Sequence, residues 1–173
     1  IPYVMEIHPS APATTVPAFI AYAKANPGKL VFASSGNGAS SHLAGELFKT
    51  MAGLDWQNVH YRGTGPSVVD LLAGQVQLTI DNLPAILPHI KSGKLKAYGV
   101  SSLKRVGSLP EVPTFIELGI PNFEAVSWVG IHVPIRTPRP VVDRLHREIA
   151  TALKDPDLRG RFETLGVEPV GNT

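Results

Sequence analysis

The chain has 173 residues, of which 43% are hydrophobic and 17% charged, so it is long and apolar enough to bury a core. Its 16 Lys and Arg residues face 14 Asp and Glu residues without a basic run, which gives nucleic-acid binding little support. The lack of cysteine excludes disulfides, thiolate zinc sites and cysteine nucleophiles. No apolar run approaches the ~20 residues that span a bilayer.

The first hundred residues alternate between strand and helix patterns. Short runs suited to a pleated sheet predict strands over residues 3–7, 30–33, 58–61, 75–80 and 95–100. Segments that open on capping residues or proline, and end near glycine or asparagine, predict helices over residues 15–25, 41–51, 66–73 and 81–91. The alternation predicts an α/β fold, with a parallel or mixed sheet that has helices on its faces.

The remaining residues have a different pattern. Residues 103–121 are rich in turn formers, and the apolar run over 126–133 predicts a strand. After a proline-rich spacer, an amphipathic helix is predicted over 141–153, a shorter one over 158–165, and a short strand over 167–170. The apolar stripe of the longer helix consists of Val142, Leu145, Ile149 and Leu153.

The most informative segment is SSGNGASSHL at residues 34–43, between a predicted strand and a predicted helix. Its glycines let the backbone turn sharply and approach a ligand, and the helix start offers free N–H groups and a positive dipole end. Serine hydroxyls add donors, so the pattern predicts an anion pocket without a formal cation. The segment has neither the Gly-Lys-Ser/Thr ending of a Walker motif nor a full dinucleotide fingerprint. An ordinary turn with a serine cap is the alternative interpretation.

Polar residues also follow the two strands that come next. The turn RGTGP at residues 62–66 repeats the strand–glycine–helix arrangement, and helix starts at one sheet edge converge on one crevice. Asp81 would either contact a ligand or cap the helix beside it. His42 has either a ligand-binding or a structural role, and Arg62 is either a ligand cation or an exposed surface side chain.

Catalytic and metal-binding patterns are not found in the sequence. The histidines form no HxxxH or HxxEH pair, and there is no GxSxG elbow and no evident pair of catalytic carboxylates. We therefore expect no catalytic residue, metal or cofactor. An enzyme on the same fold, with Asp81 or His42 as acid or base, and a ligand-sensing regulatory module are the alternative functions.

Several strings resemble the Bug-type receptors related to the tripartite tricarboxylate transporters. The resemblance extends over essentially the whole chain. The segments that carry it are residues 27–48, 60–66, 70–76, 81–84, 87–95, 109–114, 127–128 and 165–171.

This resemblance implies a periplasmic solute-binding protein with two α/β lobes of the type II periplasmic-binding fold. Residues 8–124 would form the second lobe, with a mixed sheet flanked by helices. Residues 1–7 and 125–134 would be crossover or hinge strands, and 135–173 a mainly helical part of the first lobe. The ligand-binding residues that it implies are Ser34, Ser35, Gly36, Asn37, Gly38, Ser40, Ser41, His42, Gly63, Thr64 and Asp81.

The implied ligand is a small organic acid: a di- or tricarboxylate, an amino acid or an aromatic acid. The implied partners are permease subunits in the membrane or a signalling protein. Compared with the family, the sequence has no first-lobe segment before Ile1 and no final helix after Thr173, so we interpret both ends as processed or truncated. We accordingly expect weak ligand binding, and an oligomer in which each chain covers the exposed apolar stripe of another chain's helix.

Overall fold

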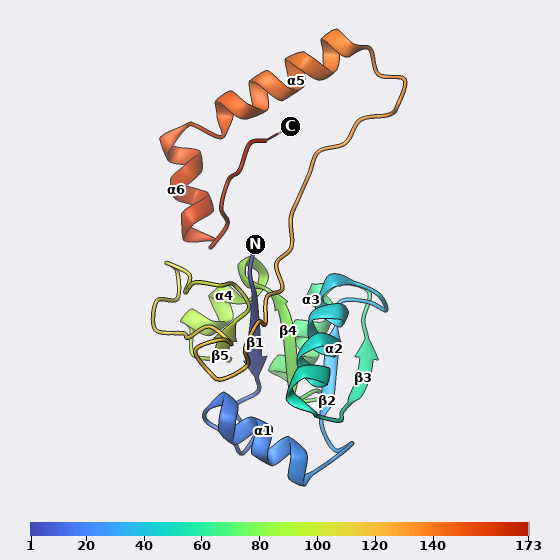
Figure 1. Ribbon diagram of the computed structural model, residues 1–173, viewed down its shortest axis with the longest axis vertical. Helices are drawn as coiled ribbons and strands as arrows, with labels where there is room; N and C mark the ends of the chain where they lie inside the picture. The colour runs from blue at the N-terminus through green and yellow to red at the C-terminus, as the bar shows by residue number, and fades with distance from the viewer. Residues whose placement is uncertain (173) are drawn as a thin grey trace.

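The computed structural model describes residues 1–172, which form a sheet-based part and a helical part (Figure 1), in contact where Gly166 lies beside the side chain of Leu83. The strands are β1 (Tyr3–Ile7), β2 (Val31–Ser34), β3 (Gln57–His60), β4 (Leu78–Asn82) and β5 (Lys96–Val100). The helices are α1 (Val16–Ala25), α2 (Ser40–Ala52), α3 (Thr64–Leu72), α4 (Leu83–Lys91), α5 (Arg139–Ala152) and α6 (Pro156–Thr164). A long extended segment connects the sheet to α5 and α6.

The five strands form one mixed sheet in the order β3-β2-β4-β1-β5, which confirms the expected α/β fold class. β2 is parallel to both β3 and β4, whereas β1 is antiparallel to its neighbours β4 and β5. β1 therefore lies inside the sheet, and all its side chains are buried. The carboxyl ends of β2, β3 and β4 consequently share one edge, where β1 begins.

Each face of the sheet is covered by two helices. On one face, α1 and α2 contribute Phe19 and Phe48 to an aromatic core, in which the rings of Phe32 and Trp56 are stacked 5.2 Å apart. On the other face, α3 and α4 contribute smaller aliphatic side chains such as Val68 and Ile86. The chain after β5 also joins the core, because Phe115 and Phe123 pack on the aromatic side.

Helix α1 begins as its sequence predicts. The side chain of Thr15 accepts a hydrogen bond from the backbone N–H of Ala18 at 3.3 Å, and Pro17 lies in the first turn. A Thr15→Ala variant is expected to lower the free energy of unfolding by about 1 kcal/mol, because a first-turn N–H loses its partner. Urea unfolding measures this change. A loss below about 0.3 kcal/mol would show that the exposed N–H is equally well served by water.

Two predicted strands are wrong. Within the described residues, 126–133 make only an isolated bridge, between Val126 and Pro2, and 167–170 are not a strand. The backbone of Ser127 pairs with Ile1, donating to its carbonyl at 2.9 Å. A strand needs a neighbouring strand along its length, and no strand of the described residues pairs with 126–133 beyond the single bridge. The apolar segment is therefore extended but not part of a sheet.

The segment that leaves the sheet is apolar and exposed. The side chains of Trp128 and Ile135 are 78% and 100% exposed. The stripe on α5 is less exposed than expected: Leu145 is exposed, but Val142, Ile149 and Leu153 are half-buried. The tail that follows α6 accounts for part of this cover, because Gly171 lies beside the side chain of Leu153. Self-association through α5 stays a prediction. Over residues 1–172, no helix has the length and apolar character to span a membrane.

Candidate anion-binding site

The Ser/Gly loop, residues 35–39, connects the end of β2 to the start of α2 at the shared edge. Ser34, the last residue of β2, is paired in register with His60, the last residue of β3. The backbone N–H of Tyr61 donates to the carbonyl of Ser34, and that of Gly63 donates to the carbonyl of Ser35, both at 2.9 Å. These bonds hold the loop beside the β3–α3 turn, so the two glycine turns predicted from the sequence lie together.

Side chains inside the loop fix its shape. The buried Ser41 hydroxyl accepts a hydrogen bond from the backbone N–H of Ser35 at 2.9 Å and lies 2.7 Å from the Ser35 hydroxyl. Nδ1 of His42 accepts from the backbone N–H of Gly38 at 3.0 Å. Ser41 and His42 therefore shape the loop, whichever further role they have. Asn37 and Ser40 are exposed.

The helices that begin at this edge have no side-chain caps. Ala39, Gly63 and Asn82 are the N-cap residues of α2, α3 and α4, and none of their side chains makes a capping hydrogen bond. Of the helices that begin elsewhere, α1 and α6 are capped by Thr15 and Asp155, whereas α5 also has no side-chain cap. The first N–H groups of a helix have no intrahelical partner and carry the positive end of its dipole. The N–H of Leu83 at the start of α4 donates to the carbonyl of Pro2, so it is chiefly the start of α2 that favours an anion at this edge.

The β3–α3 turn requires its glycine. Gly63 has φ 112°, in a region that side-chain-bearing residues rarely adopt, although no neighbouring atom would crowd a Cβ. The turn places Thr64 so that its hydroxyl donates to Oδ1 of Asp81 at 3.2 Å. Arg62 is exposed, and it is not a part of this hydrogen-bonded set.

Asp81, in β4, makes hydrogen bonds at this edge from a buried position. It is fully buried, and its Oδ1 also accepts from the backbone N–H of Asn82 at 2.7 Å, so it does not cap α4. Burial raises its pKa, although the hydrogen bonds from Asn82 and Thr64 oppose the rise. Glu6 of β1 lies on the same face of the sheet as Asp81. Its carboxyl is fully buried without a hydrogen-bond partner in the described residues. Burial, and then the nearby Asp81, raises the pKa of Glu6 well above its ordinary value.

Three residues at this edge were not among those that the sequence singles out. The hydroxyl of Ser127 donates to Oδ1 of Asn82 at 2.6 Å, which connects the beginning of the extended segment to the start of α4. His60 has its Nδ1 2.7 Å from the hydroxyl of Ser34 and its ring against that of His42. Position at a strand end was the available signal for Asn82 and His60. Ser127 had no such signal, because its contact joins segments 45 residues apart.

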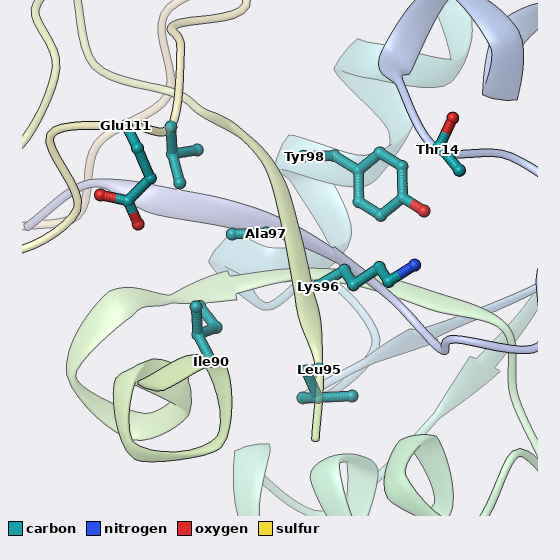
Figure 2. A pocket seen from close by; sticks show the side chains of 8 residues that line it. Thr14, Ile90, Leu95, Lys96, Ala97, Tyr98 and Glu111 are labelled. Carbon is teal, nitrogen blue, oxygen red and sulfur yellow. The ribbon is translucent and has the colours of Figure 1, made fainter. Parts of the chain in front are cut away.

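A pocket of about 280 Å³ lies away from the Ser/Gly loop (Figure 2). It is next to the start of β5, the opposite edge of the sheet from the carboxyl ends of β2, β3 and β4. Lys96 and Tyr98 lie on the side of Thr14, and Glu111 lies across the strand from them (Figure 2). A lysine and a glutamate on separate walls do not converge on an anion, so the hydrogen-bonded loops are the better candidate. Over residues 1–172, no group of three or more His, Asp and Glu side chains is placed to hold a metal ion.

The sequence matches the family described as "Tripartite tricarboxylate transporter family receptor" over residues 1–173. The chain belongs to this family. Its relatives include BugT of Bordetella pertussis, 38% identical over 170 residues, which are 98% of this chain and 52% of BugT. A UPF0065 protein in the tcbD-tcbE intergenic region of Pseudomonas sp. strain P51 is 44% identical over 86% of this chain and 45% of its own. The chain thus spans about half the length of these receptor-family relatives.

Solved structures of similar proteins have the same fold. An R. palustris protein with adipate has a TM-score of 0.97 and 36% identity, and the match covers 100% of this chain and 58% of that one. MatC of Rhodopseudomonas palustris, with bound malate, has a TM-score of 0.89 and 31% identity, over 96% of this chain and 56% of MatC. The match to the periplasmic binding protein BugD covers 99% of this chain and 57% of BugD, with 38% identity and a TM-score of 0.93.

Proposed function

We propose that the chain is the carboxylate-gripping part of an extracytoplasmic solute-binding receptor. One observation carries the proposal: in a chain of the receptor family, the start of α2 is uncapped and lies behind a Ser/Gly loop held at the carboxyl edge of the sheet. Free N–H groups at such a helix start stabilise a carboxylate without a neighbouring lysine or arginine. The adipate and malate in two similar structures support a small organic acid as the ligand.

The residues proposed to line or shape the grip are those expected from the sequence. Gly36 and Ser40 would present backbone N–H groups, and Ser35 would present its hydroxyl. The other members would hold the loops in place through the hydrogen bonds described above. These members are Ser34, Gly38, Ser41, His42, Gly63, Thr64 and Asp81, and the exposed Asn37 completes the expected set.

The proposal also includes the division of the chain into lobes and hinge segments. Residues 8–124 would be one ligand-binding lobe, 1–7 and 125–134 its hinge segments, and 135–173 a part of the other lobe. The relatives' greater length and the extended course of residues after Ser127 support this division. A receptor of this kind works in the periplasm and delivers its ligand to membrane permease subunits.

Titration calorimetry with adipate and malate tests the binding function. We expect both acids to bind, and 1,6-hexanediol, which has the length of adipate without its charge, not to bind. Raising the salt concentration should weaken binding only modestly, since the donors are backbone dipoles close to the ligand rather than distant charges. Equal binding of hexanediol and adipate would contradict a carboxylate grip.

A further inference from the structure

We propose that His60 is a second anion contact of this site, and that it favours ligands with two carboxylates over ligands with one. The inference rests on the proposed function, because it adds a residue to the same carboxylate site. His60 ends β3 at the shared edge, and its side chain is exposed. Its in-register partner Ser34 leads directly into the Ser/Gly loop.

Two contacts hold the His60 ring in place. Nδ1 lies 2.7 Å from the Ser34 hydroxyl, and the ring meets that of His42 edge to face, with centroids 4.6 Å apart. An exposed side chain loses rotamer entropy when it binds a ligand, and a ring held on two sides has less to lose. The His60 imidazole is therefore prepared to contact a group at the rim of the loop.

Both rings make their hydrogen bond through Nδ1, which leaves Nε2 of each directed away from its protein partner. Because His42 Nδ1 accepts from Gly38, the neutral ring carries its proton on Nε2. The Ser34 hydroxyl donates to the carbonyl of Gly36 at 3.3 Å, so it accepts from Nδ1–H of His60 in that arrangement. Proton uptake on Nε2 of His60 then breaks no bond, and it gives a cation at the rim. Over residues 1–172, Nε2 of neither ring makes a hydrogen bond within the protein.

The carboxylates near His42 and His60 are engaged in contacts of their own. On α2, Glu46 follows His42 by one turn, but it accepts from Asn58 at 2.8 Å and lies 3.7 Å from Nζ of Lys49. On the far side of His60, the Tyr61 hydroxyl donates to Asp70 at 2.7 Å. Arg62, two residues after His60, is exposed. β2 contributes the neutral Ser34.

Two kinds of donor, the N–H groups at the start of α2 and the imidazole of His60, determine the class of ligand. The uncapped start of α2 receives one carboxylate, and the imidazole pair beside it receives a second, which a monocarboxylic acid does not have. A hydrogen bond between charged groups contributes about 1.5–3 kcal/mol, or roughly 10-fold or more in affinity. The preference for a diacid over the monoacid of equal length is expected to be of this size.

The test compares adipate with hexanoate, which has six carbons and one carboxylate, by NMR titration of the 173-residue chain and of a His60→Phe variant. Phenylalanine keeps the ring packing on His42 and removes both nitrogens. We expect adipate to bind about 10-fold more weakly to the variant and hexanoate to change less than about 2-fold.

His146→Phe is the matched control, because His146 is an exposed histidine on α5, and it should leave both titrations unchanged. His60→Gln, a smaller polar replacement, should also weaken adipate selectively. Equal losses for both acids, or no loss for adipate, would overturn the role of His60. Binding of adipate to the wild-type chain would still support the carboxylate site in that case. If neither acid binds the wild-type chain, the proposed function fails, and this inference fails with it.

Discussion

An Ala39→Asp variant is expected to unfold at a higher urea concentration than the wild-type chain and to lose its affinity for carboxylates. Ala39 occupies the N-cap position of α2 in an extended conformation, φ −65° and ψ 159°, and makes no side-chain cap. Aspartate is among the preferred residues at this position, so the free energy of unfolding should rise by about 1 kcal/mol.

The same carboxylate would occupy the donors that the ligand needs. A group attached to the protein acts at a high effective concentration, so the affinity for adipate should fall by at least about 100-fold. Stability and binding therefore change in opposite directions, which damage to the fold does not produce. Denaturant unfolding and calorimetry on the same preparation measure both.

Two further variants separate charge from capping. Ala39→Ser caps the helix without adding charge, so it should stabilise α2 and weaken binding less than aspartate does. Thr15→Ala, at the start of α1, should destabilise the chain without affecting adipate. Wild-type affinity in Ala39→Asp would contradict the assignment of the ligand carboxylate to the start of α2.

A Glu6→Gln variant is expected to be more stable than the wild-type chain at alkaline pH. Glu6 is fully buried without a hydrogen-bond partner among residues 1–172, and its pKa is raised by burial and by Asp81. Above the ordinary pKa of glutamate, the unfolded chain loses this proton while the folded chain keeps it. Stability is therefore fully present below the ordinary value and is lost as the pH rises toward the raised value. The raised pKa of Asp81 acts in the same direction.

Glutamine is neutral at every pH, so it removes the contribution of Glu6. The free energy of unfolding at about pH 8 should exceed that of the wild type, and the difference should shrink near pH 4. Urea unfolding at the two pH values measures this. Glu117→Gln is the control: Glu117 has a lowered pKa because of Arg105, so it should show no alkaline gain. A constant difference between Glu6→Gln and wild type at all pH values would show that Glu6 is not a buried acid.

The sequence predicts the strands and helices well up to Val100, because each has local signals. Thr15 and Pro17 mark the start of α1, and Gly53 ends α2 in a left-handed conformation. The central position of β1 has no local signal, since Tyr3–Ile7 pairs with strands that begin about 70 or more residues later. The strand expected at 126–133 fails for a related reason: the run is apolar, but no strand among residues 1–172 pairs along it.

Part of the candidate site was likewise predictable from local sequence, and part was not. The Ser/Gly loop and the turn at Gly63 are predictable, because glycine and serine between a strand and a helix are a local pattern. The pairing of His60 with His42, and the burial of Glu6 beside Asp81, depend on the sheet order and register. No spacing rule reports these contacts, and they determine where charge lies at this edge.

Mapping adipate by the backbone amide shifts of the 173-residue chain is the most direct test of the carboxylate site. The largest changes should fall on the loop and first turn over residues 36–42 and on Gly63 and Thr64, with smaller changes at Asp81. Changes centred on Thr14, Lys96 and Tyr98, which line the pocket at the opposite edge, would contradict a carboxylate site at the Ser/Gly loop.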